Sequence, residues 1–111
     1  MIRNLVGSID IGSNSTLLLV IDKDKKEVIK EFSTITGLGR GLDKSGVFQE
    51  SAMNDTFNAL KKYKNEAFAL GCTKLVITAT EASRVAVNAK DFFRRISDEL
   101  ELDVQIISGE G

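Results

Sequence analysis

The sequence contains no histidine and only one cysteine among its 111 residues. Without histidine, the chain has neither a Ser-His or Cys-His catalytic pair nor a histidine-ligated metal site of its own. The single cysteine, Cys72, excludes an intrachain disulfide and a cysteine-ligated zinc site, and we interpret it as a small packing residue. The longest apolar run, residues 17–21, is far shorter than the roughly 20 residues of a membrane-spanning helix. No secretory signal pattern is present, so we expect a cytoplasmic protein without a membrane partner.

An excess of charge of one sign is also lacking. The 15 basic and 16 acidic residues leave a formal net charge of −1. Such a balance does not favour a strongly electrostatic partner, so we expect no binding to duplex nucleic acid. With 42% hydrophobic and 28% charged residues, the composition is typical of a soluble globular chain with one modest core.

Hydrophobic periodicity predicts three strands, a helix, a strand, a second helix and a last strand. Three strands joined by short turns make an antiparallel meander, and each later helix connects one strand to the next. This βββαβαβ order predicts an α/β fold with a mixed five-stranded sheet and helices, the ribonuclease-H-like half of an actin-like ATPase fold. The expected strands are 5–10, 16–21, 27–35, 75–80 and 103–107, and the expected helices are 51–70, ended by Gly71, and 89–100, with Asn88 as N-cap.

The strongest local signal for chemistry is a cluster of small polar residues directly after the first strand. Gly12 gives the backbone access to angles closed to other residues, and successive backbone N–H groups in such a turn form a concave anion site. Ser13, Asn14 and Ser15 add hydroxyl and amide donors. Asp10 would hold a hydrated Mg²⁺, or position a water, beside a bound phosphate. The same residues suit a plain hairpin turn in which Asp10 accepts backbone hydrogen bonds, and the spacing alone leaves both interpretations open.

A second signal is Arg84, which follows the expected strand 75–80. Ligands of mixed α/β sheets tend to lie beyond the carboxyl ends of central strands, where an arginine can bind two phosphate oxygens at once. The alternative is a surface arginine that pairs with Glu81. A glycine-rich segment, 37–41, matches neither a dinucleotide fingerprint in its context nor a Walker loop, and we interpret it as a flexible loop.

Five segments together resemble one known family. They occur in the family's order and at its spacing, and their combination is specific, although an Asp-Ile-Gly turn alone also occurs in sugar kinases and actin-like ATPases. The chain is similar to the exopolyphosphatase and guanosine pentaphosphate phosphohydrolase group from Leu5 to Gly109. The segments are SIDIGSNS at 8–15, LGRGLDKSG at 38–46, TATEASR at 78–84, NAKDF at 88–92 and VQIISG at 104–109.

The resemblance implies an actin-like phosphohydrolase of phosphoanhydrides. Its substrate would be inorganic polyphosphate, cut at its terminal phosphate, or guanosine pentaphosphate, cut at its 5′-phosphate. The implied cofactor is Mg²⁺, and the implied assembly of the full-length protein is a homodimer. By this analogy Asp10 stands near the Mg²⁺, residues 12–15 form the first phosphate loop, and Arg84 is catalytic and grips the phosphate under attack.

Two departures from the family pattern bear on these expectations. The family commonly has Arg-Leu-Gly where this chain has Gly37-Leu38-Gly39, so no ligand role is carried to Gly37. The family's water-activating glutamate follows the serine matched by Ser108, and Glu110 stands early for that role. We therefore expect residues 1–111 to be the N-terminal lobe of an actin-like phosphohydrolase, truncated before the catalytic helix and inactive alone. The alternative is a non-catalytic module that binds polyphosphate or guanosine polyphosphates.

Overall fold

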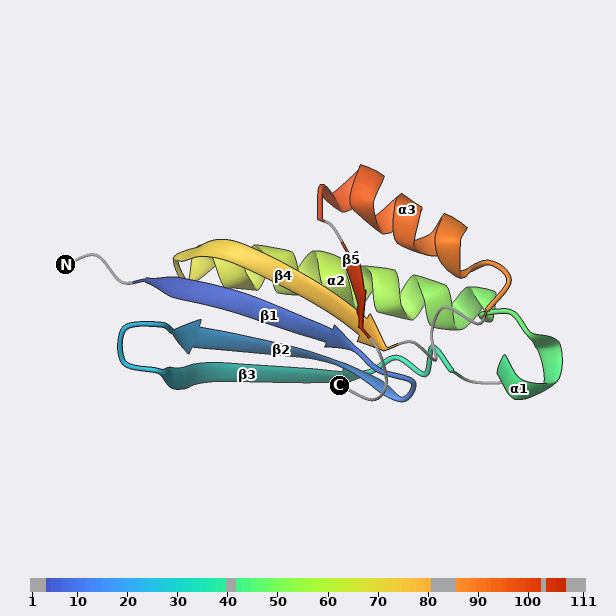
Figure 1. Cartoon of the computed structure of the whole chain (residues 1–111), viewed down its shortest axis with the longest axis horizontal. Coiled ribbons are helices and arrows are strands. Elements are labelled where there is room, and N and C mark those ends of the chain that lie inside the picture. The colour runs from blue at the N-terminus through green and yellow to red at the C-terminus, as the bar shows by residue number, and fades with distance from the viewer. Residues whose placement is uncertain (1–3, 40–41, 81–85, 103, 108–111) are drawn as a thin grey trace.

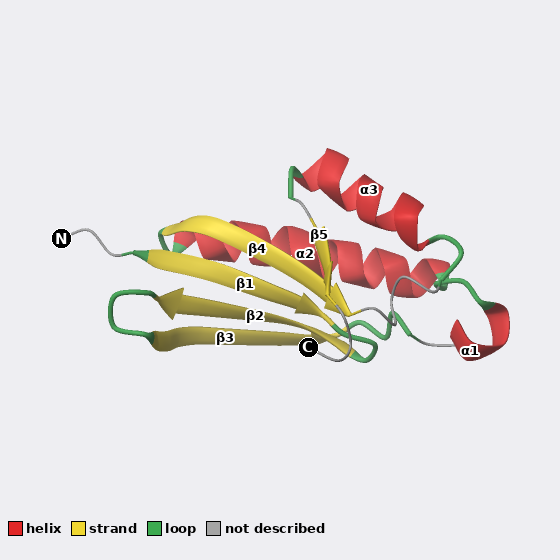
Figure 2. Cartoon of the chain, in the orientation of Figure 1, coloured by secondary structure: helices red, strands yellow, loops and turns green. Residues whose placement is uncertain are grey.

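The computed structural model describes residues 4–39, 42–80, 86–102 and 104–107. Figures 1 and 2 show the predicted strands and helices, with one short helix in addition. That extra helix is one turn long and lies between the predicted strand 27–35 and the predicted helix 51–70, and four residues are too few to produce a periodic signal. The strands are β1 (Leu5–Ile11), β2 (Ser15–Asp22), β3 (Glu27–Ile35), β4 (Cys72–Thr80) and β5 (Val104–Ile107), and the helices are α1 (Leu42–Ser45), α2 (Glu50–Ala69) and α3 (Ala89–Leu100).

The five strands form one mixed sheet in the order β3-β2-β1-β4-β5. β1 pairs antiparallel with β2, and β2 pairs antiparallel with β3, which is the predicted meander. On its other side β1 pairs parallel with β4, and β4 pairs parallel with β5. The carboxyl ends of β1, β4 and β5 therefore lie at one edge of the sheet, where Figure 1 shows the arrowheads of β1 and β4 together.

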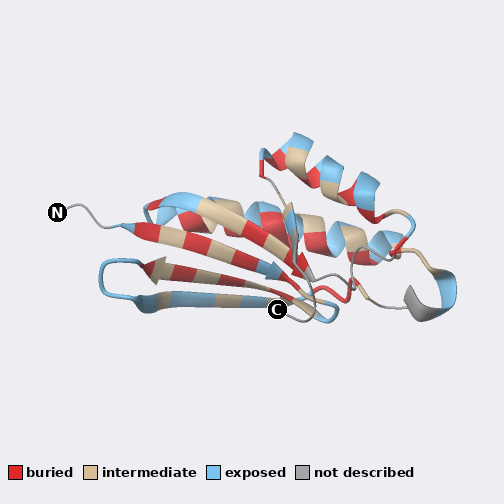
Figure 3. Ribbon diagram, in the orientation of Figure 1, coloured by how far each residue is buried: buried red, intermediate tan, exposed pale blue. Residues whose placement is uncertain are grey.

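The core lies between one face of the sheet and the helices. Leu5, Ile9 and Ile11 of β1 are fully buried, whereas Val6, Ser8 and Asp10 are more exposed, an alternation that Figure 3 shows as stripes. α2 packs on the buried face in contact with β1, β2 and β4, and α3 packs beside α2 against β5. The apolar residues that recur every second position in the strands therefore pack against those that recur about every 3.6 positions in the helices, and together they form one apolar layer.

Helix α2 buries one face against the sheet. Leu60 and Ala67 are buried, and Met53 and Phe57 pack partly buried against the core. The helix ends where predicted, because Gly71 adopts a φ of +103°, a left-handed conformation that favours glycine. No helix in the described part of the chain is long and apolar enough to cross a membrane.

Asn88 precedes α3 as predicted, but its side chain does not cap the helix. Its Oδ1 instead accepts the backbone N–H of Phe48 at 2.9 Å, and its Nδ2 donates to the Phe48 carbonyl at 3.2 Å. Phe48 is buried and its ring packs edge-on against Phe92, with centroids 5.9 Å apart. The expectation of a side-chain cap is therefore wrong. The Asn88 side chain uses its amide to bind the backbone just before α2, and so links that segment to the start of α3.

Candidate functional site

The turn between β1 and β2 is a tight hairpin. The N–H of Gly12 donates to the carbonyl of Ser15 at 2.9 Å, which closes the turn and engages the Gly12 amide. Ser13 and Asn14 are exposed at the tip, and their own N–H groups have no acceptor among the described residues. The predicted hairpin turn therefore exists, and it leaves two adjacent backbone donors open to solvent or to a ligand.

The segment that follows β3 docks against this turn. The N–H groups of Thr36 and Gly37 both donate to the carbonyl of Asn14, at 3.1 and 3.0 Å, and the N–H of Gly39 donates to the carbonyl of Ser13 at 2.9 Å. In a trans peptide the C=O and the N–H point in opposite directions. Because the carbonyls of Ser13 and Asn14 face the 36–39 segment, the N–H groups in the same two peptides, those of Asn14 and Ser15, are turned away from it.

Glycines make this close approach possible. A Cβ on Gly39 would lie 2.9 Å from the Cβ of Ser13, too close for any side chain without a shift, and Gly37 adopts a left-handed φ of +62°. The prediction of a flexible loop at 37–41 is therefore wrong for residues 37–39, which are docked. The signal was present in the alternating glycines, but sequence alone does not show which backbone they approach.

Gly12 does not adopt the unusual backbone angles that the sequence analysis expected of it. Its φ is not among the positive values that the structure records. A Cβ at this position would instead lie 3.1 Å from the Ser15 carbonyl oxygen, tighter than most real contacts. Glycine is favoured at position 12 by lack of space inside the turn rather than by an unusual backbone angle.

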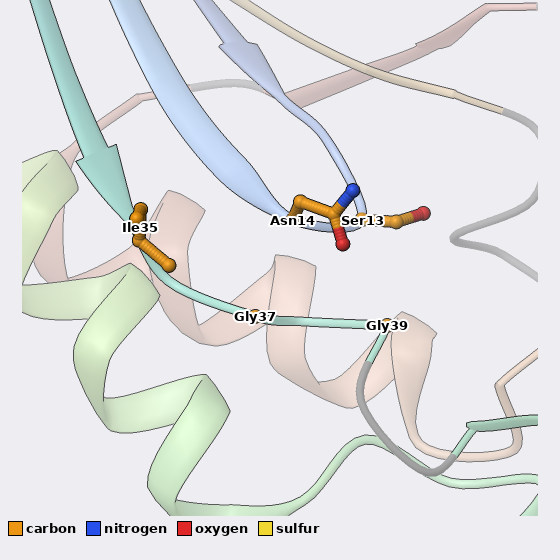
Figure 4. A pocket seen from close by; sticks show the side chains of 5 residues that line it. All are labelled: Ser13, Asn14, Ile35, Gly37 and Gly39. Carbon is orange, nitrogen blue, oxygen red and sulfur yellow. The ribbon is translucent and has the colours of Figure 1, made fainter.

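The turn and the docked segment enclose a pocket of about 440 Å³. Figure 4 shows the Ser13 and Asn14 side chains at the tip of the hairpin, across from the backbone that runs from Ile35 to Gly39. A pocket of this size suits a small ligand. The open backbone donors, the Ser13 hydroxyl and the Asn14 amide favour an anion with several oxygens.

Asp10 lies close to the turn in sequence but does not line the pocket. Its side chain is exposed, whereas Ile9 and Ile11 point into the core. Within the described ranges, no three side chains of the His, Cys, Asp and Glu types come together as a metal site. A single carboxylate nevertheless fits Mg²⁺, which commonly takes one or two protein carboxylates and completes its shell with waters and phosphate oxygens.

Three other expectations concern Arg84, Glu110 and Cys72. Arg84 and Glu110 lie outside the described residues, so their predicted roles stay predictions. Arg84 follows β4, which ends at Thr80 beside the end of β1. Cys72 is buried, and burial raises the pKa of its thiol, which agrees with a packing role rather than a reactive one.

The sequence model of the Ppx/GppA phosphatase family matches residues 19–111. The chain belongs to this family. The Ppx/GppA protein of Aquifex aeolicus shares 37% identity over 96% of the chain, with a TM-score of 0.91. An exopolyphosphatase from Cytophaga hutchinsonii shares 29% identity over the same share, with a TM-score of 0.87. The family resemblance seen in the sequence is therefore confirmed.

Two further comparisons define the fold and the extent of the match. An archaeal actin homologue, Ta0583, superimposes with a TM-score of 0.51 at 15% identity, which confirms the actin-like fold. A bifunctional 3-dehydroquinate synthase/phosphatase of Fusobacterium nucleatum is 33% identical over 96% of the chain. The chain spans 36% of the Aquifex protein, 35% of the Cytophaga protein and 17% of the Fusobacterium protein.

Proposed function

We propose that this chain is the N-terminal, phosphate-binding lobe of a phosphohydrolase that acts on phosphoanhydrides. Its substrate would be the terminal phosphate of inorganic polyphosphate or the 5′-phosphate of guanosine pentaphosphate. The observation that carries the proposal is the hairpin tip, where the N–H groups of Ser13 and Asn14 have no acceptor among the described residues and where both residues line a pocket. Membership of a phosphatase family supports the assignment of that pocket to phosphate.

The residues of the turn bind and orient the substrate. Phosphate oxygens accept hydrogen bonds from the N–H groups of Ser13 and Asn14 and from the two side chains, while Gly12 and Ser15 close the turn. These donors are held in place before the substrate arrives, so little reorganisation is needed when charge develops on the transferring group. Arg84 would add a guanidinium that binds two oxygens of the phosphate under attack.

Mg²⁺ fits this proposal as a cofactor held by Asp10. When bound, it would neutralise part of the negative charge of neighbouring phosphate oxygens. Among the described residues that line the pocket, none is an Asp or Glu that would activate a water. We therefore propose that residues 1–111 alone bind phosphate chains without hydrolysing them, and that the water-activating base is supplied from elsewhere in the full-length protein.

The proposal is tested by comparing the full-length protein with residues 1–111. Both are incubated with Mg²⁺ and either polyphosphate or guanosine pentaphosphate, and released phosphate is measured against a tag-only control. We expect release by the full-length protein and none by residues 1–111. Failure of the full-length protein to cleave either substrate would contradict the hydrolase assignment. If that protein bound the substrates but released nothing, the alternative of a non-catalytic binding module would replace it.

Residue Asn14 gives a charge test of the same pocket. Asn14→Asp keeps the shape of the side chain but places a negative charge beside the bound phosphate. Two like charges about 4 Å apart repel by about 1 kcal/mol in water and by more near a protein surface. We expect tripolyphosphate to bind at least about fivefold more weakly, measured by calorimetric titration. Asn65→Asp, an exposed position on α2, makes the same charge change away from the turn and should leave the affinity unaltered.

A further inference from the structure

A network of buried hydroxyl groups lies directly behind the hairpin turn. Thr16, Thr36 and Tyr63 are each at most 1% exposed. The hydroxyl oxygens of Thr16 and Thr36 are 3.0 Å apart, and the Tyr63 hydroxyl donates to the Thr16 carbonyl at 3.2 Å. The Thr34 hydroxyl also contacts the Tyr63 hydroxyl. Since Tyr63 has one proton to donate, Thr34 is the donor in that contact.

Most buried side chains of this protein are apolar, so a cluster of buried hydroxyl groups needs a physical reason. Burying a hydroxyl costs free energy unless a partner is provided, and an apolar side chain would avoid that cost. Among the described residues, every buried side-chain nitrogen or oxygen has such a partner. The network is therefore complete, and its position indicates what it does.

The network connects the helix α2 to both backbone segments that form the pocket. Thr16 directly follows Ser15, the last residue of the turn. Thr36 begins the docked segment, and its N–H donates to the Asn14 carbonyl. The hydroxyl contact between Thr16 and Thr36 thus spans the two walls, and Tyr63 anchors it from the helix.

We propose that Thr36 is a positioning residue for the phosphate site. Its hydroxyl, held by that of Thr16, fixes the 36–39 segment against the turn. The hydrogen bond from Gly39 to the Ser13 carbonyl in turn sets the direction of the open Asn14 N–H in the same peptide. The inference rests on the proposed function of the turn, because positioning matters there only if those N–H groups bind phosphate. A site of this kind depends on the support behind it as much as on the groups that touch the ligand.

The test removes the Thr36 hydroxyl without changing the shape of the side chain. Thr36→Val should raise the hydrogen-exchange rates of the amides at positions 36 and 37, which donate to the Asn14 carbonyl, by about tenfold. It should also weaken tripolyphosphate binding by a similar factor. Thr36→Ser keeps the hydroxyl and should restore both measurements, which a purely volume-filling role would not do.

Thr56 provides the matched control. It is equally buried, and its hydroxyl donates to the Ala52 carbonyl at 2.8 Å within α2, away from the turn. Thr56→Val should leave both the exchange at positions 36 and 37 and the affinity unchanged. If Thr36→Val does not fold, the double variant Thr16→Val/Thr36→Val, which leaves neither hydroxyl unpaired, is used in its place.

The outcomes separate the two proposals. Unchanged exchange in Thr36→Val, or an equal change in Thr56→Val, would overturn the positioning role. Faster exchange with unchanged tripolyphosphate affinity would overturn it as well, because the segment would then not support the site. If the unaltered chain bound no tripolyphosphate at all while Thr36→Val still loosened the amides, the proposed function of the turn would fail, although the mechanical link would stand.

Discussion

The meander contains two hairpin turns, at opposite ends of β2 (Figure 1). The backbone N–H groups of one turn are bound by a side chain of the protein, whereas those at the tip of the other have no acceptor among the described residues. In the turn between β2 and β3, a carboxylate oxygen of Asp22 accepts the N–H groups of Asp24 and Lys25 at 3.0 and 3.1 Å. The turn between β1 and β2 has no such acceptor in the described residues, so the N–H groups of Ser13 and Asn14 stay open.

The difference lies in which groups take the backbone hydrogen bonds, because both turns consist of small or polar residues. At the first turn the carbonyls of Ser13 and Asn14 are engaged by the docked segment 36–39, whereas the N–H groups of the same two residues have no acceptor among the described residues. At the second turn the protein's own carboxylate occupies the place that a bound anion would take. A polar turn becomes a candidate anion site only when a neighbouring segment holds its carbonyls and nothing in the chain satisfies its amides.

Among the variants that distinguish the two turns, Gly39→Ala should change stability and tripolyphosphate affinity the most. The new methyl group would clash with the Ser13 side chain and force the docked segment away from the turn. We expect a loss of about 1–3 kcal/mol in the free energy of unfolding, measured by urea titration, and more than tenfold weaker tripolyphosphate binding. Gly46→Ala is the control, because its added methyl meets nothing within 4 Å although its φ is +74°. Equal affinities of the two variants would show that the docking is not needed.

A smaller effect, confined to stability, is expected from Asp22→Ala. The change removes the acceptor of two hydrogen bonds to a carboxylate and should cost about 1.5–3 kcal/mol in the free energy of unfolding. Tripolyphosphate affinity should stay the same, because the two turns are at opposite ends of the strand. Asp22→Asn keeps one acceptor oxygen and should lose less. A change in affinity with Asp22→Ala would contradict the independence of the two turns.

Cys72 reports on the Asp22 end of the sheet. It and Asp22 both pair with Leu5, from opposite sides of β1. Burial raises the pKa of its thiol, so less thiolate is present near pH 8 than in a free cysteine, and labelling by iodoacetamide should be slow. Stability should fall as the pH rises above the ordinary thiol pKa, because the unfolded chain loses that proton first. Asp22→Ala should accelerate the labelling, whereas Gly39→Ala should affect it less.

The smallest effect is expected from Lys26→Gly at the end of the second turn. Lys26 has a left-handed φ of +55°, which is unfavourable for a residue with a side chain. Relief of that strain is partly offset by the larger entropy of glycine in the unfolded chain, so we expect a gain of about 0.5 kcal/mol. Glu101→Gly, at a φ of +56° after α3, is a matched change and should give a similar gain. Neither variant should alter tripolyphosphate affinity.

The sequence predicted the fold well because its signals are local. The strand predicted at 27–35 and the helix that ends before Gly71 each depend on neighbours along the chain, and the structure confirms both. The alternation of burial in β3 is interrupted at Ile29, where the pairing with β2 shifts register. The short turn predicted between the strands 16–21 and 27–35 is also present, and Asp22 finds its partners there two and three residues away. Local patterns of this kind are what periodicity and turn rules detect.

The parts that the sequence did not show depend on long-range contacts. The docking of Gly39 on Ser13 and the link from Tyr63 to Thr16 join residues far apart in the chain. The side chain of Asn88 likewise prefers the distant backbone of Phe48 to its own helix. A local rule predicted that the Asn88 side chain caps its own helix, and only the tertiary structure shows that it binds the Phe48 backbone instead.

The most direct test of the account is an amide-resolved NMR titration with tripolyphosphate. The two turns serve as each other's control within one sample. We predict saturable shifts of the amide signals of Ser13 and Asn14, with little change at Asp24 and Lys25, whose N–H groups are already bound by Asp22. Shifts of equal size at both turns, or at Asp24 and Lys25 alone, would contradict the claim that open backbone donors make the first turn a phosphate site.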